Sequence, residues 1–251
     1  MSMFCYQCEQ TSQNTGCTAF GVCGKDPDTA ALQDLLVEVC KQISVAVQGK
    51  KSPAADLYVM KGLFTTVTNV NFDAENIAVV IRQGSAILHQ LGATSTINFS
   101  ADLNGLIKQG EAVGIESRMR KFGADLTGLQ ELVMYGLKGM AAYADHAYVL
   151  GKSDERVFAF IHEALVGLTN PAPSVDQLFG LAMKVGEINL LVMGLLDEAN
   201  TGSYGHPVPT PVNINAVKGK AILVSGHDLK DLELLLKQTE GKGVNIYTHG
   251  E

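Results

Sequence analysis

The stretch DPDTAALQDLLVEVCKQISVAVQG (26–49) indicates most clearly what kind of fold this chain adopts. Asp26 suits the N-cap of a helix, Pro27 suits its first turn, and Gly49 suits its end. Between these residues the apolar side chains recur at helical spacing, at Leu32, Leu35, Leu36, Val39, Cys40, Ile43 and Val47. Such a period predicts a helix that buries one apolar face.

Further helical patterns follow this first helix along the chain. They cover residues 56 to about 67, 73 to about 91, 102–122, 126–150, 154–168 and 175–198. Glycines interrupt the segment 102–122, and Asn170-Pro171 separates the last two patterns. We therefore predict that residues 1–200 form a helical bundle, which would be the N-terminal domain.

The amino-acid composition of the sequence changes after Asn200. Residues 201–219 are rich in proline and glycine and are predicted to be a linker. Residues 220–251 then show a short apolar strand, a helix with Asp228 at its N-cap, and a second short strand. This order is a βαβ unit, which builds parallel sheets. The predicted fold is mainly α: a helical bundle followed by the start of a Rossmann-like α/β domain, because two strands rarely make a stable sheet.

Composition and charge argue against several classes of function, including nucleic-acid binding and membrane association. The chain has 251 residues and a formal net charge of -7, without a cluster of Lys and Arg that would favour a nucleic-acid partner. The apolar run Leu190–Leu196 is too short to span a membrane, so no membrane partner is expected. The N-terminus lacks the features of a secretory signal. We therefore expect a cytoplasmic protein, in which thiols stay reduced.

Four of the five cysteines lie within the first 23 residues: Cys5, Cys8, Cys17 and Cys23. They follow the pattern C-x2-C-x8-C-x5-C in a segment without apolar periodicity, which we predict to be a loop. Four thiolates suit either an iron–sulfur cluster or zinc. Zinc sites usually present two separated cysteine pairs, so the single spacing of the later cysteines favours a cluster. Cys40 lies on the apolar face of its helix and is predicted to pack in the core.

The chain also resembles a known family along its whole length. The segments that carry the resemblance are FCYQCEQT (4–11), GCTAFGVCGK (16–25), GLFTTVTNVNFD (62–73), GMAAYADHA (139–147), GSYGHPVPT (202–210), ILVSGHDLKDLE (222–233) and NIYTHGE (245–251). Together they resemble the hybrid-cluster protein family, also called prismane proteins or hydroxylamine reductases. The resemblance implies that Cys5, Cys8, Cys17 and Cys23 hold a [4Fe–4S] cluster.

The resemblance further implies a second centre, a hybrid Fe–S–O cluster, with His227 and Glu251 among its ligands. Both residues follow predicted parallel strands, whose carboxyl ends lie about 5 Å apart in a sheet. Ligands bind at that edge of open α/β sheets. Judged by the residues alone, however, His227 could be a turn residue and Glu251 a solvated one. His249 is the nearest competitor as a ligand.

The remaining histidines receive no chemical role. His146 and His206 lie in segments that carry the resemblance. His89 and His162 fall in helical patterns and are predicted to be structural or exposed.

The function that the resemblance implies is the reduction of hydroxylamine to ammonia and water, with nitric oxide reduction as a related activity. An electron-donor redox protein would feed the [4Fe–4S] cluster, and a small nitrogen-oxide substrate would bind the hybrid cluster.

The family's hybrid cluster needs further cysteines, and none follows Cys40. The chain is therefore expected to be a fragment of a longer protein. The alternatives are an electron-transfer module without catalysis, a carbon monoxide dehydrogenase-like enzyme, against which the cysteine spacing speaks, and a scaffold held by zinc.

Overall fold

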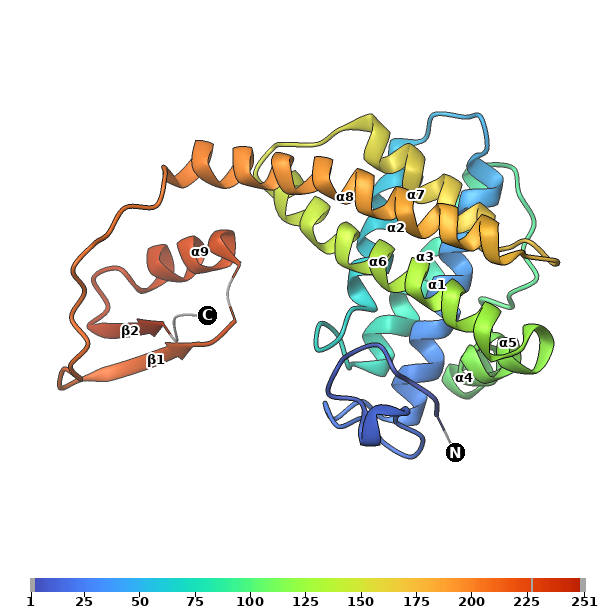
Figure 1. The fold of residues 1–251 in the computed structure, drawn as a ribbon. Helices are drawn as coiled ribbons and strands as arrows, with labels where there is room; N and C mark the ends of the chain where they lie inside the picture. The colour runs from blue at the N-terminus through green and yellow to red at the C-terminus, as the bar shows by residue number, and fades with distance from the viewer. Residues whose placement is uncertain (1–2, 227, 249–251) are drawn as a thin grey trace.

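The computed structural model describes residues 3–226 and 228–248. Its elements are α1 (Pro27–Val47), α2 (Pro53–Thr65), α3 (Ala74–Gln90), α4 (Leu103–Val113), α5 (Ile115–Phe122), α6 (Ala124–Val149), α7 (Glu155–Gly167), α8 (Val175–Tyr204), β1 (Lys220–Val224), α9 (Leu229–Thr239) and β2 (Val244–Thr248). A short 3-10 turn spans Ser12–Asn14. The mainly α fold predicted from the sequence is confirmed (Figure 1).

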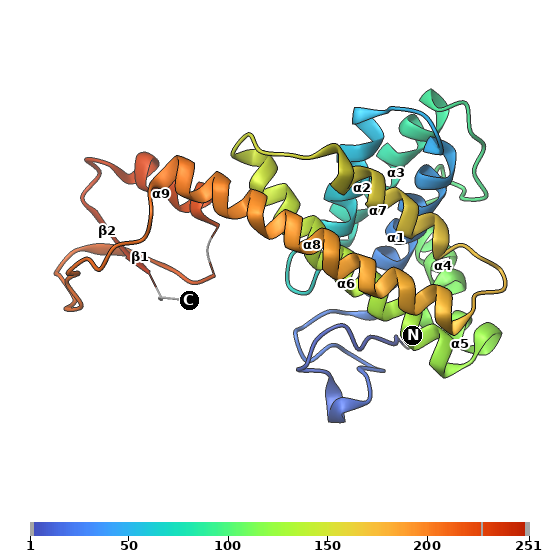
Figure 2. The ribbon, with the colours of Figure 1, turned by 45° about the horizontal axis from the view of Figure 1, so that its top comes forward.

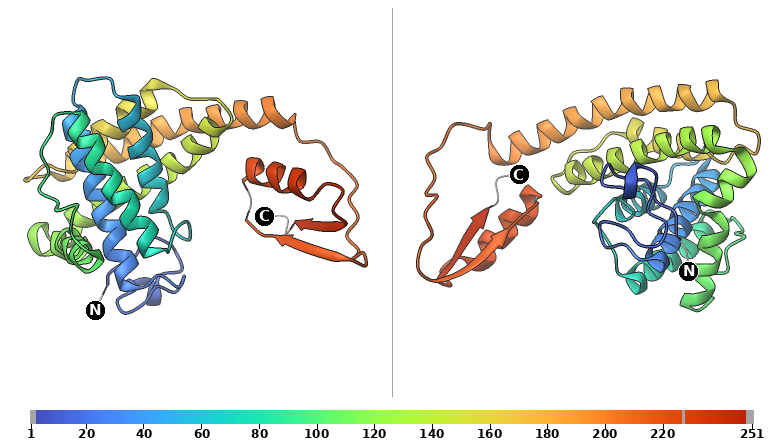
Figure 3. Two further views of the ribbon diagram at one scale, coloured as in Figure 1. Left: turned by 180° about the vertical axis from the view of Figure 1, so that it is seen from behind. Right: turned by 60° about the horizontal axis from the view of Figure 1, so that its bottom comes forward.

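Helix α1 is the centre of the bundle. It packs against α2, α3, α4 and α7. Seen from behind, α1 and α3 lie side by side in the bundle (Figure 3). Side chains such as Leu32, Leu36 and Ile43 are fully buried. Asp26 caps the helix, because its Oδ1 accepts a 2.6 Å hydrogen bond from the Thr29 N–H. The predicted boundaries of this helix, including the cap, are confirmed.

Helices α6 and α8 run side by side across one face of the bundle (Figure 2). The sequence predicted one interrupted helix over 102–122, and the structure instead has α4 and α5, which separate at Gly114. Gly114 adopts an extended conformation with ψ of 176°, which a helix cannot accommodate. Helix α8 extends beyond the predicted residue 198 to Tyr204, where Gly205 with φ of 80° ends it.

Helix α8 exposes much of its apolar surface. Val175, Phe179, Met183 and Leu190 are each more than half exposed. By length and composition α8 could cross a membrane. The sequence did not predict this, because only the uninterrupted apolar run Leu190–Leu196 was considered. The absence of a membrane partner therefore stays a prediction.

A capping box begins α8. The Ser174 hydroxyl accepts a hydrogen bond from the Gln177 N–H at 3.2 Å, and the side-chain oxygen of Gln177 accepts one from the Ser174 N–H at 3.3 Å. This arrangement satisfies two N–H groups that a helix leaves free at its start.

Replacing Ser174 with alanine should lower the free energy of unfolding by about 1 kcal/mol, because the cap is lost. Urea denaturation followed by circular dichroism measures this change. Ser203→Ala, at the exposed C-terminal end of the same helix, is the control and should leave stability unchanged or slightly raised. Equal stability of the Ser174 variant and the parent chain would show that the capping box contributes nothing.

The predicted βαβ unit is confirmed. Strands β1 and β2 pair in parallel, in a register from Lys220 opposite Val244 to Val224 opposite Thr248. Leu223 in β1 is 69% exposed. Parallel sheets are normally covered on both faces, and the prediction that this α/β unit is incomplete stays a prediction. The division into domains at residues 200 and 220 stays a prediction.

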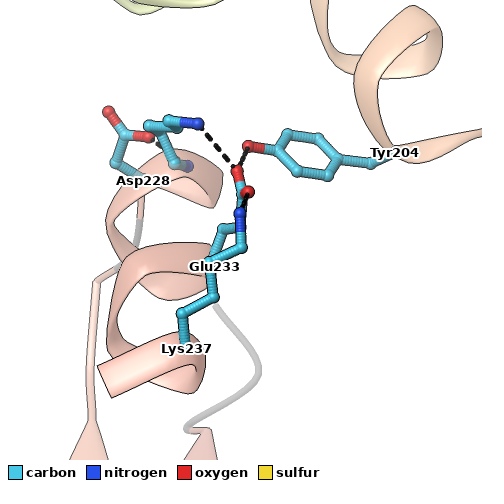
Figure 4. A network of polar contacts seen from close by, with 5 residues as sticks. Tyr204, Asp228, Glu233 and Lys237 are labelled. Atoms are coloured by element: carbon cyan, nitrogen blue, oxygen red, sulfur yellow. Dashed lines mark hydrogen bonds and ion pairs between the residues drawn. The ribbon is translucent and has the colours of Figure 1, made fainter.

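Polar contacts connect this unit to the end of α8 (Figure 4). The Tyr204 hydroxyl donates to Glu233 Oε2 at 3.0 Å, and Lys230 Nζ lies 2.9 Å from the same oxygen. Lys237 binds the other carboxylate oxygen of Glu233. Hydrogen bonds from Lys237, Lys230 and Tyr204 lower the pKa of Glu233 to about 2.

We expect Glu233 to keep its charge in acid that neutralises ordinary glutamates. A titration of its carboxyl carbon by NMR should give a midpoint near pH 2. Tyr204→Phe should raise that midpoint, because one donor to the carboxylate is lost, whereas the control Tyr148→Phe should leave it unchanged. A Glu233 midpoint at its ordinary value in the parent chain would refute this network.

Candidate metal centre

The cysteine loop, residues 3–25, lies against the N-terminal end of α1 (Figure 1). Cys5 and Cys17 form an isolated antiparallel bridge in which the Cys17 N–H donates to the Cys5 carbonyl at 2.8 Å and the Cys5 N–H donates to the Cys17 carbonyl at 3.1 Å. Between Cys8 and Cys17, Gln13 and Asn14 adopt positive φ values of 54° and 57°, which turn the chain back. The loop therefore brings cysteines far apart in sequence to one place.

The four cysteine side chains of this loop, Cys5, Cys8, Cys17 and Cys23, line a single small cavity. Cys17 is buried and the others are half-buried, and all four are free thiols. Among the residues that the structure describes, no group of three or more His, Cys, Asp or Glu side chains lies close enough to bind one metal ion. In a cubane cluster each thiolate binds a different iron atom, so the ligands surround a shared space rather than meet at a point.

Donors lie near the sulfur atoms of Cys17 and Cys5. The Ser12 N–H donates to Cys17 Sγ at 3.4 Å, and the Thr11 hydroxyl lies 3.7 Å from the same atom. The ammonium group of Lys25 lies 3.9 Å from Cys5 Sγ, although Lys25 is only 4% exposed. Sequence reasoning missed these donors, whose only signal is their position between or just after the cysteines.

The same donors favour the charged form of a sulfur atom. Burial alone would raise the pKa of Cys17, but it is outweighed by backbone hydrogen bonds from Ser12 and Val22, the Thr11 hydroxyl and the charge of Lys25, so the pKa is lowered. The thiolate is the form that binds metal. The donor set therefore suits a thiolate-bound cofactor.

Cys40 behaves differently. It is fully buried in the apolar core, and burial raises the pKa of its thiol to about 12. Its predicted role in core packing is confirmed.

The second predicted site lies mostly outside the described residues. His227, His249 and Glu251 are not described. The described ends of the two strands, Val224 and Thr248, are paired in register. The assignment of His227 and Glu251 to a metal site therefore stays a prediction.

The other histidines are placed by the structure. His162 is buried, and its ring nitrogens lie 2.8 Å from the Ser44 hydroxyl and 3.0 Å from Asp56 Oδ1, which confirms a structural role. His146 Nε2 lies 3.5 Å from Asp228 Oδ2 and so connects α6 to the start of α9. His89 and His206 are exposed.

Comparison with known proteins identifies the family. The model of the Prismane/CO dehydrogenase family matches residues 3–251. The chain belongs to this family. Among curated relatives, a hydroxylamine reductase from Methanocella arvoryzae is 50% identical over 99% of this chain and 49% of its own length. Hydroxylamine reductases from Rhodospirillum rubrum and Geobacter metallireducens are 48% and 45% identical.

These relatives of the Prismane/CO dehydrogenase family are longer than the chain. The chain spans about half the length of the curated relatives it matches: 99% of the chain aligns with 50% of the Rhodospirillum rubrum protein, and the whole chain with 50% of the Geobacter metallireducens protein. The family resemblance inferred from the sequence is thus confirmed over the whole chain.

Proposed function

We propose that this chain is the electron-transfer part of an iron–sulfur oxidoreductase that reduces hydroxylamine, and that Cys5, Cys8, Cys17 and Cys23 hold its [4Fe–4S] cluster. The observation that carries the proposal is the convergence of four free cysteine side chains on one cavity, with donors directed at the sulfur atoms. Membership of a family whose curated relatives are named hydroxylamine reductases supports it.

When bound, the cluster supplies reversible one-electron transfer. The residues of the chain determine how readily that electron enters. The Ser12 N–H and the Lys25 ammonium place positive charge beside the sulfur atoms, which stabilises the more negative, reduced state. Cys17 is buried, so water screens the interactions at its sulfur atom only weakly.

The substrate-reducing centre would be the hybrid Fe–S–O cluster, with His227 and Glu251 among its ligands. In a protein of the length of the relatives, other segments would supply the cysteines that this chain lacks. Reduction of hydroxylamine consumes two electrons and two protons and yields ammonia and water. Glu251 could also relay protons, and unchanged turnover and cluster content in Glu251→Gln would rule that role out.

The test is an anaerobic assay of the native protein that contains this chain. With a reduced viologen dye as electron donor, hydroxylamine should be consumed and ammonia formed in equal amounts. Oxidation of carbon monoxide, assayed in parallel, should be absent. A protein that holds the cluster and accepts electrons, yet does not convert hydroxylamine, would contradict the reductase assignment.

The alternative is an electron-transfer module without catalysis of its own. The spacing and donors of the cysteine loop fit this role equally well, so the hydroxylamine assay separates the two. In both cases we expect the partner to be an electron-donor redox protein and the location to be the cytoplasm, where thiols stay reduced.

A further inference from the structure

A group of buried charged side chains lies next to the cysteine loop and has no part in the proposed electron transfer. Lys138 and Glu131 of α6 are 6% and 4% exposed, and Lys41 of α1 is 8% exposed. Arg118 of α5 pairs with Glu131 Oε1 at 2.5 Å. Charged groups are rarely buried without a reason, because removing them from water is costly.

Asp34 of α1 connects this group to solvent. It lines an outer cavity of about 200 Å³ whose rim carries the exposed side chains Glu111, Glu116 and Arg120. It also lines an inner cavity of about 20 Å³, together with Lys138, Glu131 and Cys5. Among the residues that the structure describes, Asp34 is the one titratable group that lines both cavities.

The two cavities differ in what they can hold. The inner cavity is large enough for about one water molecule, and its polar lining could bind that water. The outer cavity is open to solvent. Asp34 thus stands between bulk water and a polar space that reaches the Cys5 side chain.

The charged groups around Asp34 explain why this residue can gain or lose a proton. The charged and titratable groups that face it or surround it are Cys5 and Lys25 of the cysteine loop, Lys41 of α1, Glu111 of α4, Glu116, Arg118 and Arg120 of α5, and Glu131, Tyr135 and Lys138 of α6. Burial, opposed by Lys138, raises the pKa of Asp34 to about 6. An added negative charge nearby would raise this pKa further.

We propose that Asp34 takes up a proton from the outer cavity when the cluster is reduced, so that electron entry and proton entry are coupled in this domain. The inference rests on the proposed cluster. A one-electron donor of the reduced viologen type supplies the electron. A hydronium ion in the outer cavity supplies the proton, which forms an O–H bond on a carboxylate oxygen of Asp34.

The test is the midpoint potential of the cluster in the 251-residue chain, followed by spectroelectrochemistry between about pH 5 and about pH 8. In the parent chain the potential should be constant below about pH 6 and fall as pH rises above that value, because only the ionised Asp34 can take up a proton. Asp34→Asn should abolish this dependence. The control Glu240→Gln, which removes an exposed carboxylate that lines neither cavity, should behave as the parent.

A second measurement does not depend on how the midpoint potential changes with pH. The infrared difference spectrum on reduction should show a carboxylic acid band in the parent chain and lack it in Asp34→Asn. An Asp34→Asn variant that keeps the parent's pH dependence, or a parent potential that is constant over the whole range, overturns the inference and leaves the cluster proposal intact. A parent chain without a reducible cluster overturns both.

Discussion

Replacing Cys17 with serine should remove the cluster from the chain. Cys17 is the most buried of the four loop cysteines, and it receives the Ser12 N–H and Thr11 hydroxyl contacts. A serine hydroxyl is not deprotonated at neutral pH and is a poor ligand for iron in such a cluster. Iron should fall from about four atoms per chain to less than about one, with loss of the visible absorbance.

The matched control is Cys40→Ala. Cys40 is a free, buried cysteine of the same chain, but it belongs to the apolar core rather than to the loop. This variant should keep the iron content of the parent while losing some stability, because a small void is left in the core. Full iron content in Cys17→Ser, or loss of iron in Cys40→Ala, would contradict the assignment of the cluster to the loop.

Replacing Gly110 with alanine should destabilise the bundle by about 3 kcal/mol or more, because it overpacks the contact between two helices. At this position α4 crosses α1 so closely that an added Cβ would lie 2.0 Å from the Ala31 carbonyl oxygen and 2.5 Å from its carbon. These are backbone atoms of the central helix, which cannot turn aside as a flexible side chain could. Thermal or urea denaturation measures the loss.

Gly128 provides the comparison. It lies inside α6, and an added Cβ would meet nothing within 4 Å. Gly128→Ala should therefore stabilise the chain by about 0.5 to 1 kcal/mol, through helix propensity alone. Similar stabilities of the two variants would mean that α4 and α1 do not approach as closely as the structure shows.

The helices were largely predictable because their apolar periods and caps are local features. Asp26 and Gly49 marked the first helix correctly, and Asp228 marked the start of α9. The break between α4 and α5 was not predictable. Several glycines occur in that segment, and only the tertiary structure shows that Gly110 allows a close helix crossing whereas Gly114 leaves the helical conformation.

The candidate site was predictable only in part. The spacing of the cysteines indicated the loop, since metal-binding thiols follow recognisable intervals. The buried ammonium of Lys25 and the position of Asp34 between two cavities depend on how α1, α5 and α6 pack, which no local pattern encodes. His227 and Glu251 lie outside the described residues, so their place beside a metal rests on the resemblance and on the paired ends of β1 and β2.

The most direct test of the central claim is the metal and sulfide content of the 251-residue chain purified without oxygen, combined with its low-temperature electron paramagnetic resonance spectrum after reduction. We expect about four irons and about four acid-labile sulfides per chain, with a signal typical of a reduced [4Fe–4S] cluster. A chain that binds about one zinc, with neither sulfide nor a reducible chromophore, would contradict the account and would mean that the four cysteines hold a structural metal ion.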